Sequence, residues 1–244
     1  MLIVLKFGGT SLQDPQRVAV AAGRVAEELA RGNRVVAVVS AWGDTTDELL
    51  QQAAAITDES SARELDACLS AGEQISAALL AMAVMKKGYD AISLTGAQAG
   101  LLTDAEHGNA RVLGLRNDRI RRELERGKGV IVAGFQGVDG LGDITTLGRG
   151  GSDTTAVALA AYLGAGECRI YTDVDGVYDR DPRQFPDATR LDRVDYDTML
   201  AMARQGAQVL HDRCVELAML YRVPIRVLSS FRPGAGTLVT DTLE

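Results

Sequence analysis

The sequence predicts an α/β domain in which a mostly parallel sheet is covered by helices on both faces. Two observations lead to this fold class. The hydrophobic pattern switches repeatedly between the alternation of a strand and the longer repeat of a helix. The strand-like runs are also apolar at successive positions, which is typical of strands that helices cover on both sides. Because no linker or low-complexity tract divides the sequence, we expect a single domain over residues 1–244.

The expected strands are short runs rich in β-branched and other apolar residues, at 2–7, 34–41, 90–96, 130–138, 168–174 and 225–230. Helical patterns alternate with them, near 14–31, 46–56, 60–87, 117–127, 152–163, 195–206 and 211–222. This alternation is what joins parallel strands, since a parallel pair needs a long crossover. The Asp-Gly turn in "GVDGLGDITTL" (137–147) predicts a β-hairpin that separates two halves of the sheet.

Composition and charge argue against several classes of protein. A formal net charge of −7 disfavours a nucleic-acid-binding surface. The cysteines Cys68, Cys168 and Cys214 have neither disulfide nor metal-ligand spacing, which indicates a reduced, cytoplasmic setting. The opening "MLIVLKFGG" is too short for a signal peptide, and there is no run of about 18 apolar residues to predict a membrane span.

Glycine-rich and polar segments follow the expected strands, at 8–11, 40–46, 147–153 and 172–183. Ligands of open parallel sheets bind beyond the carboxyl ends of the strands, so these segments are expected to converge on one site.

The first of these segments belongs to "KFGGTS" (6–11). Gly8 and Gly9 present backbone N–H groups that can hold phosphate oxygens, and Lys6 can stabilise a phosphoryl group during transfer. A plain turn with a solvated lysine explains the same residues, and the sequence contains no Walker A loop.

The segment "TTLGRGGSDTTAVALAA" (145–161) surrounds Arg149 with glycines and then opens an alanine-rich helix. Ser152 suits a helix N-cap and Asp153 suits the helix dipole, so a structural role explains both. An arginine embedded in glycines instead favours a clamp for a carboxylate or a phosphate.

Glu73 lies on the apolar stripe of an expected helix, at helical spacing from Leu69, Ala77 and Leu80. Burial of a carboxylate there is costly unless a cation or hydrogen-bond donors meet it. The ammonium group of a ligand can be that cation, but the residues alone favour an internal ion pair with an arginine.

The segment "YTDVDGVYDRDPR" (171–183) is a strand that runs into an acidic loop without the EF-hand pattern. Asp173 can accept hydrogen bonds from ribose hydroxyls and Arg183 can bind phosphate, whereas turn chemistry explains most of the aspartates. His107 and His211 belong to no nucleophile or zinc signature, so neither is given a catalytic role.

Taken together, these segments resemble the catalytic domain of aspartate kinases, in the amino acid kinase family. The segments that match the family's order and spacing are "KFGGTS", "VVSAWGDTTDELL", "SAGEQIS", "VAGFQG", "TLGRGGSDTTAVALAA", "YTDVDGVYDRDPR" and "SSFRPGAGTLV". The resemblance covers essentially the whole chain. It implies a three-layer αβα sandwich and a homodimer, with an amino-acid-substrate half at about 1–140 and a nucleotide half at about 141–244.

The activity that the resemblance implies is transfer of the γ-phosphoryl group of MgATP to the β-carboxylate of L-aspartate. The product is 4-phospho-L-aspartate, which opens the synthesis of lysine, threonine and methionine. Mg²⁺ is expected with ATP from the chemistry of phosphoryl transfer, and the sequence offers no dedicated protein ligand for it.

The resemblance also implies roles for individual residues. Lys6 would stabilise the transferring phosphoryl group, and Asp153 would organise the site around it. Arg149 would hold the α-carboxylate of aspartate and Glu73 its α-ammonium group. The pocket would be lined by Ser40, Thr46, Phe135 and Ser152. The nucleotide would contact a phosphate loop of Gly8, Gly9, Thr10 and Ser11, and further along the chain Thr172, Asp173, Tyr178, Arg183 and Gln208.

Two features depart from the family pattern. Within "GAQVLHDRCVELA" (206–218), Gln208 occupies a position where the family commonly has a cation near the ATP phosphates, and Asp212 stands where proline is common. Loss of that charge should weaken nucleotide binding or slow transfer, unless Arg183 or Arg213 compensates. The sequence also ends at "GTLVTDTLE", without the regulatory ACT domains of most family members, so feedback control within the chain is not expected.

Two alternative functions stay open at this stage. The first keeps the fold and changes the acceptor to glutamate, acetylglutamate, carbamate or UMP, although "GRGGSDTT" and "SAGEQIS" favour aspartate. The second is a degenerate nucleotide-binding or regulatory subunit, which Gln208 suggests and the intact Lys6, Arg149 and Asp153 oppose. Neither nucleic acid nor membrane is expected as a partner, whereas a separate regulatory subunit is compatible with the sequence.

Overall fold

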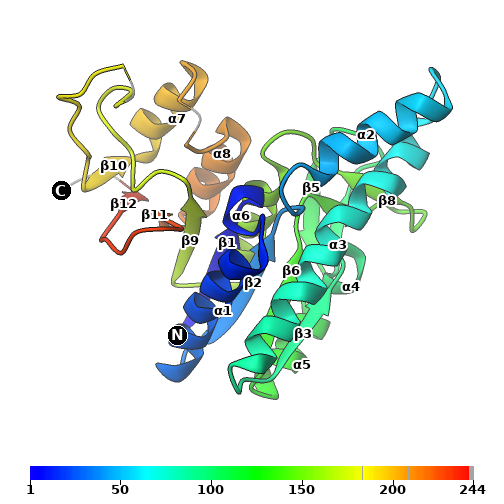
Figure 1. The fold of residues 1–244 in the computed structure, drawn as a ribbon, viewed down its shortest axis with the longest axis horizontal. Helices are drawn as coiled ribbons and strands as arrows, with labels where there is room; N and C mark the ends of the chain where they lie inside the picture. Colours follow the sequence, from blue (N-terminus) through cyan, green and yellow to red (C-terminus); the bar gives the residue numbers. More distant parts are fainter. Residues whose placement is uncertain (183, 208, 242–244) are drawn as a thin grey trace.

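The computed structural model describes residues 1–182, 184–207 and 209–241, and a large sheet lies at its centre between layers of helices (Figure 1). The strands of this sheet follow the order β10 (Arg193–Asp195), β12 (Thr237–Thr240), β11 (Ile225–Ser229), β9 (Glu167–Thr172), β1 (Leu2–Phe7), β2 (Arg34–Val39), β6 (Gly129–Ala133) and β3 (Ala91–Leu94). The six strands from β11 to β3 run parallel, whereas β12 pairs antiparallel with β11 and carries β10 at the edge. The mostly parallel sheet predicted from the sequence is confirmed.

The helices connect these strands and cover both faces of the sheet. They are α1 (Pro15–Ala30), α2 (Thr45–Ile56), α3 (Ala62–Lys86), α4 (Gly96–Ala99), α5 (Asp118–Glu125), α6 (Gly151–Leu163), α7 (Tyr196–Arg204) and α8 (Asp212–Tyr221). A 3-10 turn, η1, covers Gly9–Ser11. All seven helices expected from the sequence are present within a few residues of their expected bounds, and α4 is an additional short one.

Alternate residues of each central strand enter different cores, because successive side chains of a strand point to opposite faces. In β1, Ile3 and Leu5 pack with α1 and α3, whereas Leu2 and Val4 pack with residues of α6, α7 and α8. Figure 1 shows α1 and α3 together on one side of the sheet. The result is the three-layer αβα sandwich that the resemblance implied.

The helix α3 is long and apolar enough to cross a membrane, judged by length and composition alone. In the structure it packs against α1, β3 and β6, and half of its most apolar window is buried. This helix is a core element of the domain and carries no argument for a membrane span.

A second, four-stranded sheet is the main departure from the predicted strands. Its order is β5 (Val112–Leu115), β4 (Leu101–Thr103), β7 (Gln136–Val138) and β8 (Ile144–Thr146). The run at 130–138 was expected to be one strand, but Phe135 has φ of 68°, which turns the chain out of β6 and into β7. The hairpin predicted over 137–147 is confirmed as β7 and β8, although it belongs to this second sheet.

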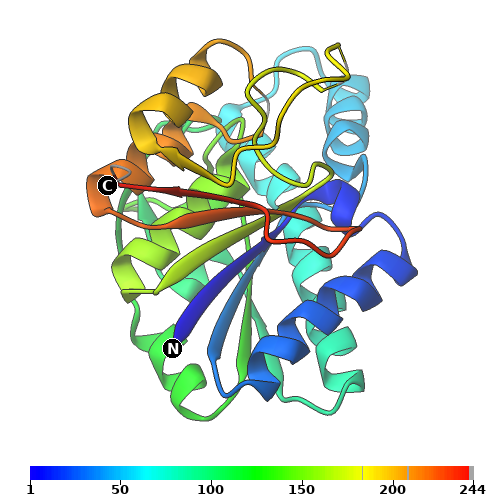
Figure 2. The ribbon, with the colours of Figure 1, turned by 90° about the vertical axis from the view of Figure 1, so that its left-hand side faces the viewer.

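The strand β1 lies where connections leave the central sheet in opposite directions. Helix α1 leads from β1 to β2 on one side, and α6 leads into β9 on the other. Open α/β sheets bind ligands in the crevice that such a switch point creates at the carboxyl ends of the strands. Figures 1 and 2 both place α2, which follows β2, and the loop 173–182, which follows β9, at this end of the molecule.

Two glycines that end helices provide a test of close packing around the second sheet. Gly100 ends α4 and Gly164 ends α6, both in the left-handed conformation. A Cβ on Gly100 would lie 2.1 Å from the carbonyl oxygen of Arg116, whereas nothing lies within 4 Å of one on Gly164. We expect Gly164→Ala to lower the free energy of unfolding by about 1–2 kcal/mol, from backbone strain alone.

Gly100→Ala should lower the free energy of unfolding by about 1–3 kcal/mol more than Gly164→Ala does, because the Arg116 carbonyl must also move. Urea denaturation of both variants checks this, and equal losses would contradict the close approach of Gly100 to Arg116.

Candidate active site

An ion pair between Lys6 and Asp153 lies at the end of the central strand. Lys6 follows Leu2 and Val4 in the alternation of β1, so its side chain points to the face that α6 covers. The Nζ atom of Lys6 lies 2.7 Å from Oδ1 of Asp153, and the two side chains are only 11% and 14% exposed. Asp153 stands in the first turn of α6, where the helix dipole favours a negative charge.

A cavity of about 730 Å³ opens beside this pair. It is lined by nine residues that the sequence predicted for the site, namely Lys6, Gly9, Ser40, Thr46, Glu73, Phe135, Arg149, Ser152 and Asp153. They come from β1, the segment after β2, α2, α3, the turn after β6 and the start of α6. Sequence reasoning missed Ala41, Gly43 and Asp47, which also line the cavity and which carry no distinguishing chemistry in the sequence.

Glu73 is a buried carboxylate in this cavity, with 3% exposure. Its Oε1 accepts a hydrogen bond from the backbone N–H of Ala41 at 3.0 Å, while its buried Oε2 has no hydrogen-bond partner among the described residues. Burial raises the pKa of Glu73 to about 7, against the lowering effect of the Ala41 N–H. The internal ion pair favoured from the sequence is wrong, because no lysine or arginine of the described chain pairs with Glu73.

Arg149 lies in a tight loop between two glycines, and its side chain is exposed to the cavity. Gly148 and Gly150 have φ of 72° and 68°, and a Cβ on Gly150 would lie 2.4 Å from Cβ of His211. Only glycine therefore fits at position 150. Within the described part of the chain, Arg149 forms neither an ion pair nor a hydrogen bond, so its guanidinium is available to a ligand.

Phe135 also lines the cavity, and its backbone is held in a strained left-handed conformation. Its N–H donates to Oγ1 of Thr155 at 3.1 Å, which secures this turn against α6. Gly134 and Gly151 permit the close approach, since a Cβ on either would lie 2.8 Å from an atom of Ser152 or Phe135, respectively. The turn after β6 and the start of α6 are thus fitted together at the cavity wall.

The four residues of the predicted phosphate loop have different surroundings. Gly9 lines the cavity. Gly8 lies beside Lys6, because a Cβ added to Gly8 would lie 3.4 Å from Nζ of Lys6. The Thr10 carbonyl accepts a hydrogen bond from Arg17. The Ser11 hydroxyl is buried and forms a 2.5 Å hydrogen bond with that of Ser230. The geometry therefore places Gly8 and Gly9 nearest to Lys6.

A second cavity, of about 500 Å³, includes Asp173 and Tyr178 in its lining, together with residues from the following loop and the end of α7. The Tyr178 hydroxyl donates to Oδ1 of Asp175 at 2.9 Å, and this bond raises the pKa of Tyr178. The Thr172 hydroxyl donates to Oδ1 of Asp173 at 3.0 Å. The predicted residues Arg183 and Gln208 lie outside the described residues.

The two cavities flank the end of β1. The first follows β2, and the second follows β9, the strand that pairs with β1 on its other side. In the residues that the structure describes, no group of three or more His, Cys, Asp and Glu side chains is arranged to hold a metal ion. The arrangement suits a reaction between two bound molecules across Lys6 and Asp153.

Comparison with known proteins identifies relatives of this chain. The profile of the amino acid kinase family matches residues 1–229. An aspartokinase of Geobacillus stearothermophilus is 55% identical over 243 residues, which are 100% of this chain and 60% of that protein. Aspartokinase 2 of Bacillus subtilis is 53% identical over 240 residues, 98% of this chain and 59% of that protein. The chain spans about three fifths of the length of these curated relatives.

Solved structures extend the likeness to the fold. The aspartate kinase from Synechocystis has a TM-score of 0.89 at 46% identity, covering 99% of this chain and 40% of that one. The E. coli aspartokinase III in complex with aspartate and ADP has a TM-score of 0.89 at 29% identity, covering 100% of this chain and 65% of that one. With a family profile that matches nearly its whole length, this chain belongs to the amino acid kinase family.

Proposed function

We propose that this chain is the catalytic domain of an aspartate kinase. It transfers the γ-phosphoryl group of MgATP to the β-carboxylate of L-aspartate and forms 4-phospho-L-aspartate, in the cytoplasm, as the first step towards lysine, threonine and methionine. One observation carries the proposal: Glu73, a buried carboxylate, and Arg149, neither of which has an ion-pair partner among the described residues, share a cavity with the Lys6–Asp153 pair. The names of the relatives, and the complex of one of them with aspartate and ADP, support it.

The acceptor cavity is suited to an α-amino acid. Glu73 Oε2 has no partner in the part of the chain that the structure describes and can accept a hydrogen bond from an α-ammonium group. Arg149 can bind the α-carboxylate through two parallel hydrogen bonds. Ser40, Thr46, Phe135 and Ser152 surround this pair of groups. Carbamate, UMP and acetylglutamate have no free ammonium group, so they would leave Glu73 buried and unpaired.

Glutamate, the remaining alternative acceptor, has both α-groups and differs from aspartate by one methylene. Discrimination between the two must come from the distance between the α-carbon and the phosphoryl group. One extra methylene in a substrate typically changes the free energy of transition-state binding by about 1–3 kcal/mol.

The nucleotide is proposed to occupy the second cavity, with its ribose at Asp173 and its base beside Thr172 and Tyr178. Its phosphates would reach Lys6 past Gly8 and Gly9, with Thr10 and Ser11 completing the loop. Arg183 and Gln208 would lie near the phosphates. Mg²⁺ would arrive bound to ATP, as part of the substrate.

In this scheme residues of about 1–140 bind most of the acceptor, and residues of about 141–244 bind most of the nucleotide. The segment Arg149–Asp153 extends from the nucleotide half into the acceptor cavity. Transfer would occur at the boundary of the two halves.

The reaction needs no protein nucleophile, because a carboxylate oxygen of the substrate attacks the γ-phosphorus directly. The bond from that phosphorus to the bridging oxygen of ADP breaks as the new bond forms, and charge spreads over the three remaining oxygens. Lys6 would neutralise part of this charge, and Asp153 holds the Lys6 ammonium in place at 2.7 Å. The protein contributes position and charge stabilisation.

We also propose a homodimer, with a separate regulatory subunit as a possible partner and with neither nucleic acid nor membrane as a ligand. These proposals rest on the resemblance and the net charge of −7.

Trapping of the product with hydroxylamine tests the activity, because an acyl phosphate reacts to give a coloured hydroxamate. The chain is incubated with MgATP and hydroxylamine, and with L-aspartate, L-glutamate or no acceptor. Hydroxamate formation with aspartate alone is expected. A folded chain that binds ATP but forms no hydroxamate with either acid would contradict the proposal.

Replacement of the central lysine should slow the chemical step. Lys6→Met removes the ammonium group from the phosphoryl path, and we expect kcat to fall by roughly 30- to 1000-fold, which corresponds to about 2–4 kcal/mol. Lys128→Met is the control, since Lys128 pairs with Glu123 at 3.2 Å on the other side of the fold, and it should leave kcat unchanged. A Lys6→Met variant that keeps most of its kcat would remove Lys6 from the mechanism.

The pH dependence of aspartate binding should follow the ionisation of Glu73. The neutral carboxyl predominates below its pKa of about 7, so the apparent affinity for aspartate should rise as the pH increases through that value and then level off. Initial-rate measurements of KM from pH 5.5 to 8.5 check this. Glu73→Gln should bind aspartate weakly with a flat profile, while Glu64→Gln, which changes an exposed carboxylate on the same helix, should keep the wild-type profile.

The same carboxyl should make the free energy of unfolding depend on pH. Its pKa is raised in the fold from 4.5 to about 7, so the folded chain holds a proton that the unfolded chain releases between these values. Stability therefore falls with rising pH over this window, by about 3 kcal/mol from this group. Urea denaturation should show that the free energy of unfolding of Glu73→Gln, relative to that of the wild type, is higher at pH 8 than at pH 4 by about that amount. An equal difference at both pH values would contradict the raised pKa.

A further inference from the structure

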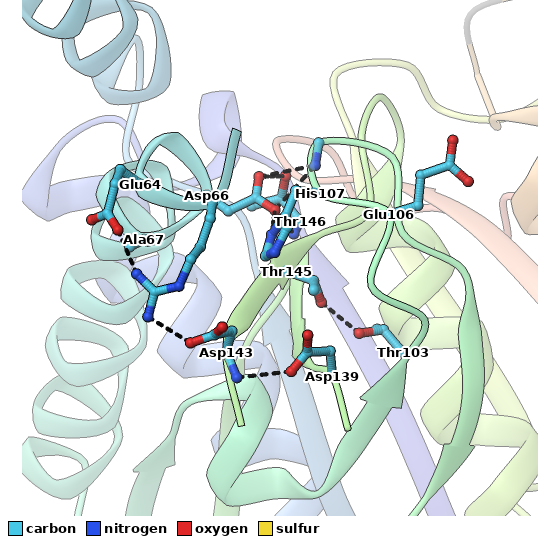
Figure 3. Close-up of polar contacts among 12 residues, drawn as sticks. Glu64, Asp66, Ala67, Thr103, Glu106, His107, Asp139, Asp143, Thr145 and Thr146 are labelled. Carbon is cyan, nitrogen blue, oxygen red and sulfur yellow. Dashed lines mark hydrogen bonds and ion pairs between the residues drawn. The ribbon is translucent and has the colours of Figure 1, made fainter. Parts of the chain in front are cut away.

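Asp66 is a buried carboxylate that the proposed chemistry does not use. It lies on α3 seven residues before Glu73, which places both on the same buried stripe of that helix. Its side chain is 1% exposed, so its charge has to be satisfied within the protein. Figure 3 shows Asp66 beside His107 and Thr146, which come from two other segments of the chain.

Three donor groups and a histidine ring nitrogen surround the two oxygens of Asp66. The Thr146 backbone N–H donates to Oδ2 at 2.9 Å, and the Thr146 hydroxyl donates to Oδ1 at 2.5 Å. The Gly108 N–H lies 3.1 and 3.0 Å from the two oxygens, and Nδ1 of His107 lies 2.9 Å from Oδ2. Asp66 therefore joins α3 to the end of β8 and to the loop 104–110.

The end of β8 that Asp66 holds leads directly to Arg149, three residues after Thr146. The loop 104–110 supports the same segment, because the Gly108 carbonyl oxygen lies 3.1 Å from the position of a Cβ on Gly148. From the opposite side, Arg213 on α8 donates from Nη1 to the carbonyl oxygen of Leu147 at 2.8 Å, and from Nη2 to that of Ala110 at 2.8 Å. The Arg149 loop thus leaves from a strand end that is fixed on both sides.

We propose that Asp66 is a positioning residue that sets the specificity of the acceptor site. This proposal rests on the proposed function. Glu73 and Arg149 bind groups on the same α-carbon, so their relative position determines where that carbon lies. The distance from there to the phosphoryl group at Lys6 then decides whether a side chain of the length of aspartate or of glutamate reaches it. Asp66 fixes this geometry by joining the helix that carries Glu73 to the strand that leads to Arg149.

The chemistry of Asp66 makes it a sensitive position. The N–H and hydroxyl of Thr146 and the N–H of Gly108 all donate, so both oxygens must accept. Asp66→Asn replaces one acceptor by an NH₂ donor that would meet N–H or O–H groups, and the variant therefore loosens the junction without changing its volume. Small displacements of a reacting group have large kinetic effects, which makes the acceptor preference the informative measurement.

A matched control joins the same two elements elsewhere. Asp143, between β7 and β8, accepts a hydrogen bond from Nη2 of Arg63 on α3 at 2.5 Å, and Arg63 lowers the pKa of Asp143. This ion pair is partly exposed, and Asp143 comes just before β8, whereas Arg149 comes after the other end of that strand. Asp143→Asn should therefore leave the acceptor site unchanged.

The test measures kcat and KM for aspartate and for glutamate, with melting temperature as a second readout. For Asp66→Asn we expect the KM for aspartate to rise about tenfold or more with a smaller change in kcat, and the ratio of kcat/KM between aspartate and glutamate to fall. Thr146→Val, which removes the hydroxyl donor, should shift the ratio in the same direction, and Thr146→Ser should restore it. Asp143→Asn should keep the wild-type ratio.

Three results would overturn the proposal. If Asp66→Asn melts at a lower temperature but keeps the wild-type KM and acceptor ratio, Asp66 is only a structural residue. If Asp66→Asn does not fold, unchanged kinetics in Thr146→Val reject the positioning role. If the wild-type chain shows no turnover with aspartate, the proposed function fails and this proposal fails with it. If the wild type and the Asp66 and Thr146 variants all prefer aspartate over glutamate to the same degree, the role of Asp66 alone is rejected.

Discussion

The ion pair of Lys6 and Asp153 is the constraint around which this fold is organised. An ammonium group at the end of a central strand, flanked by β2 and β9, loses most of its hydration and needs a fixed partner. The first turn of α6 provides that partner, at the helix end where negative charge is favoured. Because α6 starts there, the glycine loop that carries Arg149 must precede it at the same edge of the sheet. A buried ion pair is weak support for stability, so its place in the wall of the first cavity fits the catalytic role proposed for it.

Two buried carboxylates on α3 illustrate opposite treatments of the same chemical group. Asp66 has three donors and a histidine ring nitrogen around its two oxygens, whereas Glu73 has one donor and an oxygen without a partner among the described residues. The first arrangement fixes neighbouring segments, and the second leaves an electrostatic demand that a ligand can meet. In the proposed function, one helix therefore supplies both the group that would bind the ligand and the support for the segment opposite it. This arrangement resembles the general requirement that a binding group be held by a rigid surrounding shell.

The sequence was sufficient for the long elements and insufficient where distant segments meet. Strong apolar runs such as 2–7 predicted the central strands, but β10 and β12 have only three or four residues each and take their pairing from neighbouring strands. The turn at Phe135 depends on a backbone conformation that no local pattern indicates. The surroundings of Lys6 and Arg149 single them out in the sequence, whereas Asp153 enters through the resemblance alone, and the structure brings all three to one cavity. The hydrogen bonds of Glu73 and Ser11 join residues far apart in the sequence. Glu73 bonds to Ala41, 32 residues away, and Ser11 bonds to Ser230, 219 residues away. Pattern reading has no access to such contacts.

The close approach of Gly150 to His211 gives the two cavities a mechanical connection. A Cβ on Gly150 would lie 2.4 Å from Cβ of His211, so the loop of Arg149 and the entry to α8 cannot move independently. The same entry to α8 follows the segment that borders the second cavity through Ala207 and Val209. In the proposed function the Arg149 loop would hold the acceptor and this segment would border the donor, so the contact would join the two substrate sites. Thermodynamic linkage would then make any effect of one substrate on the affinity for the other reciprocal.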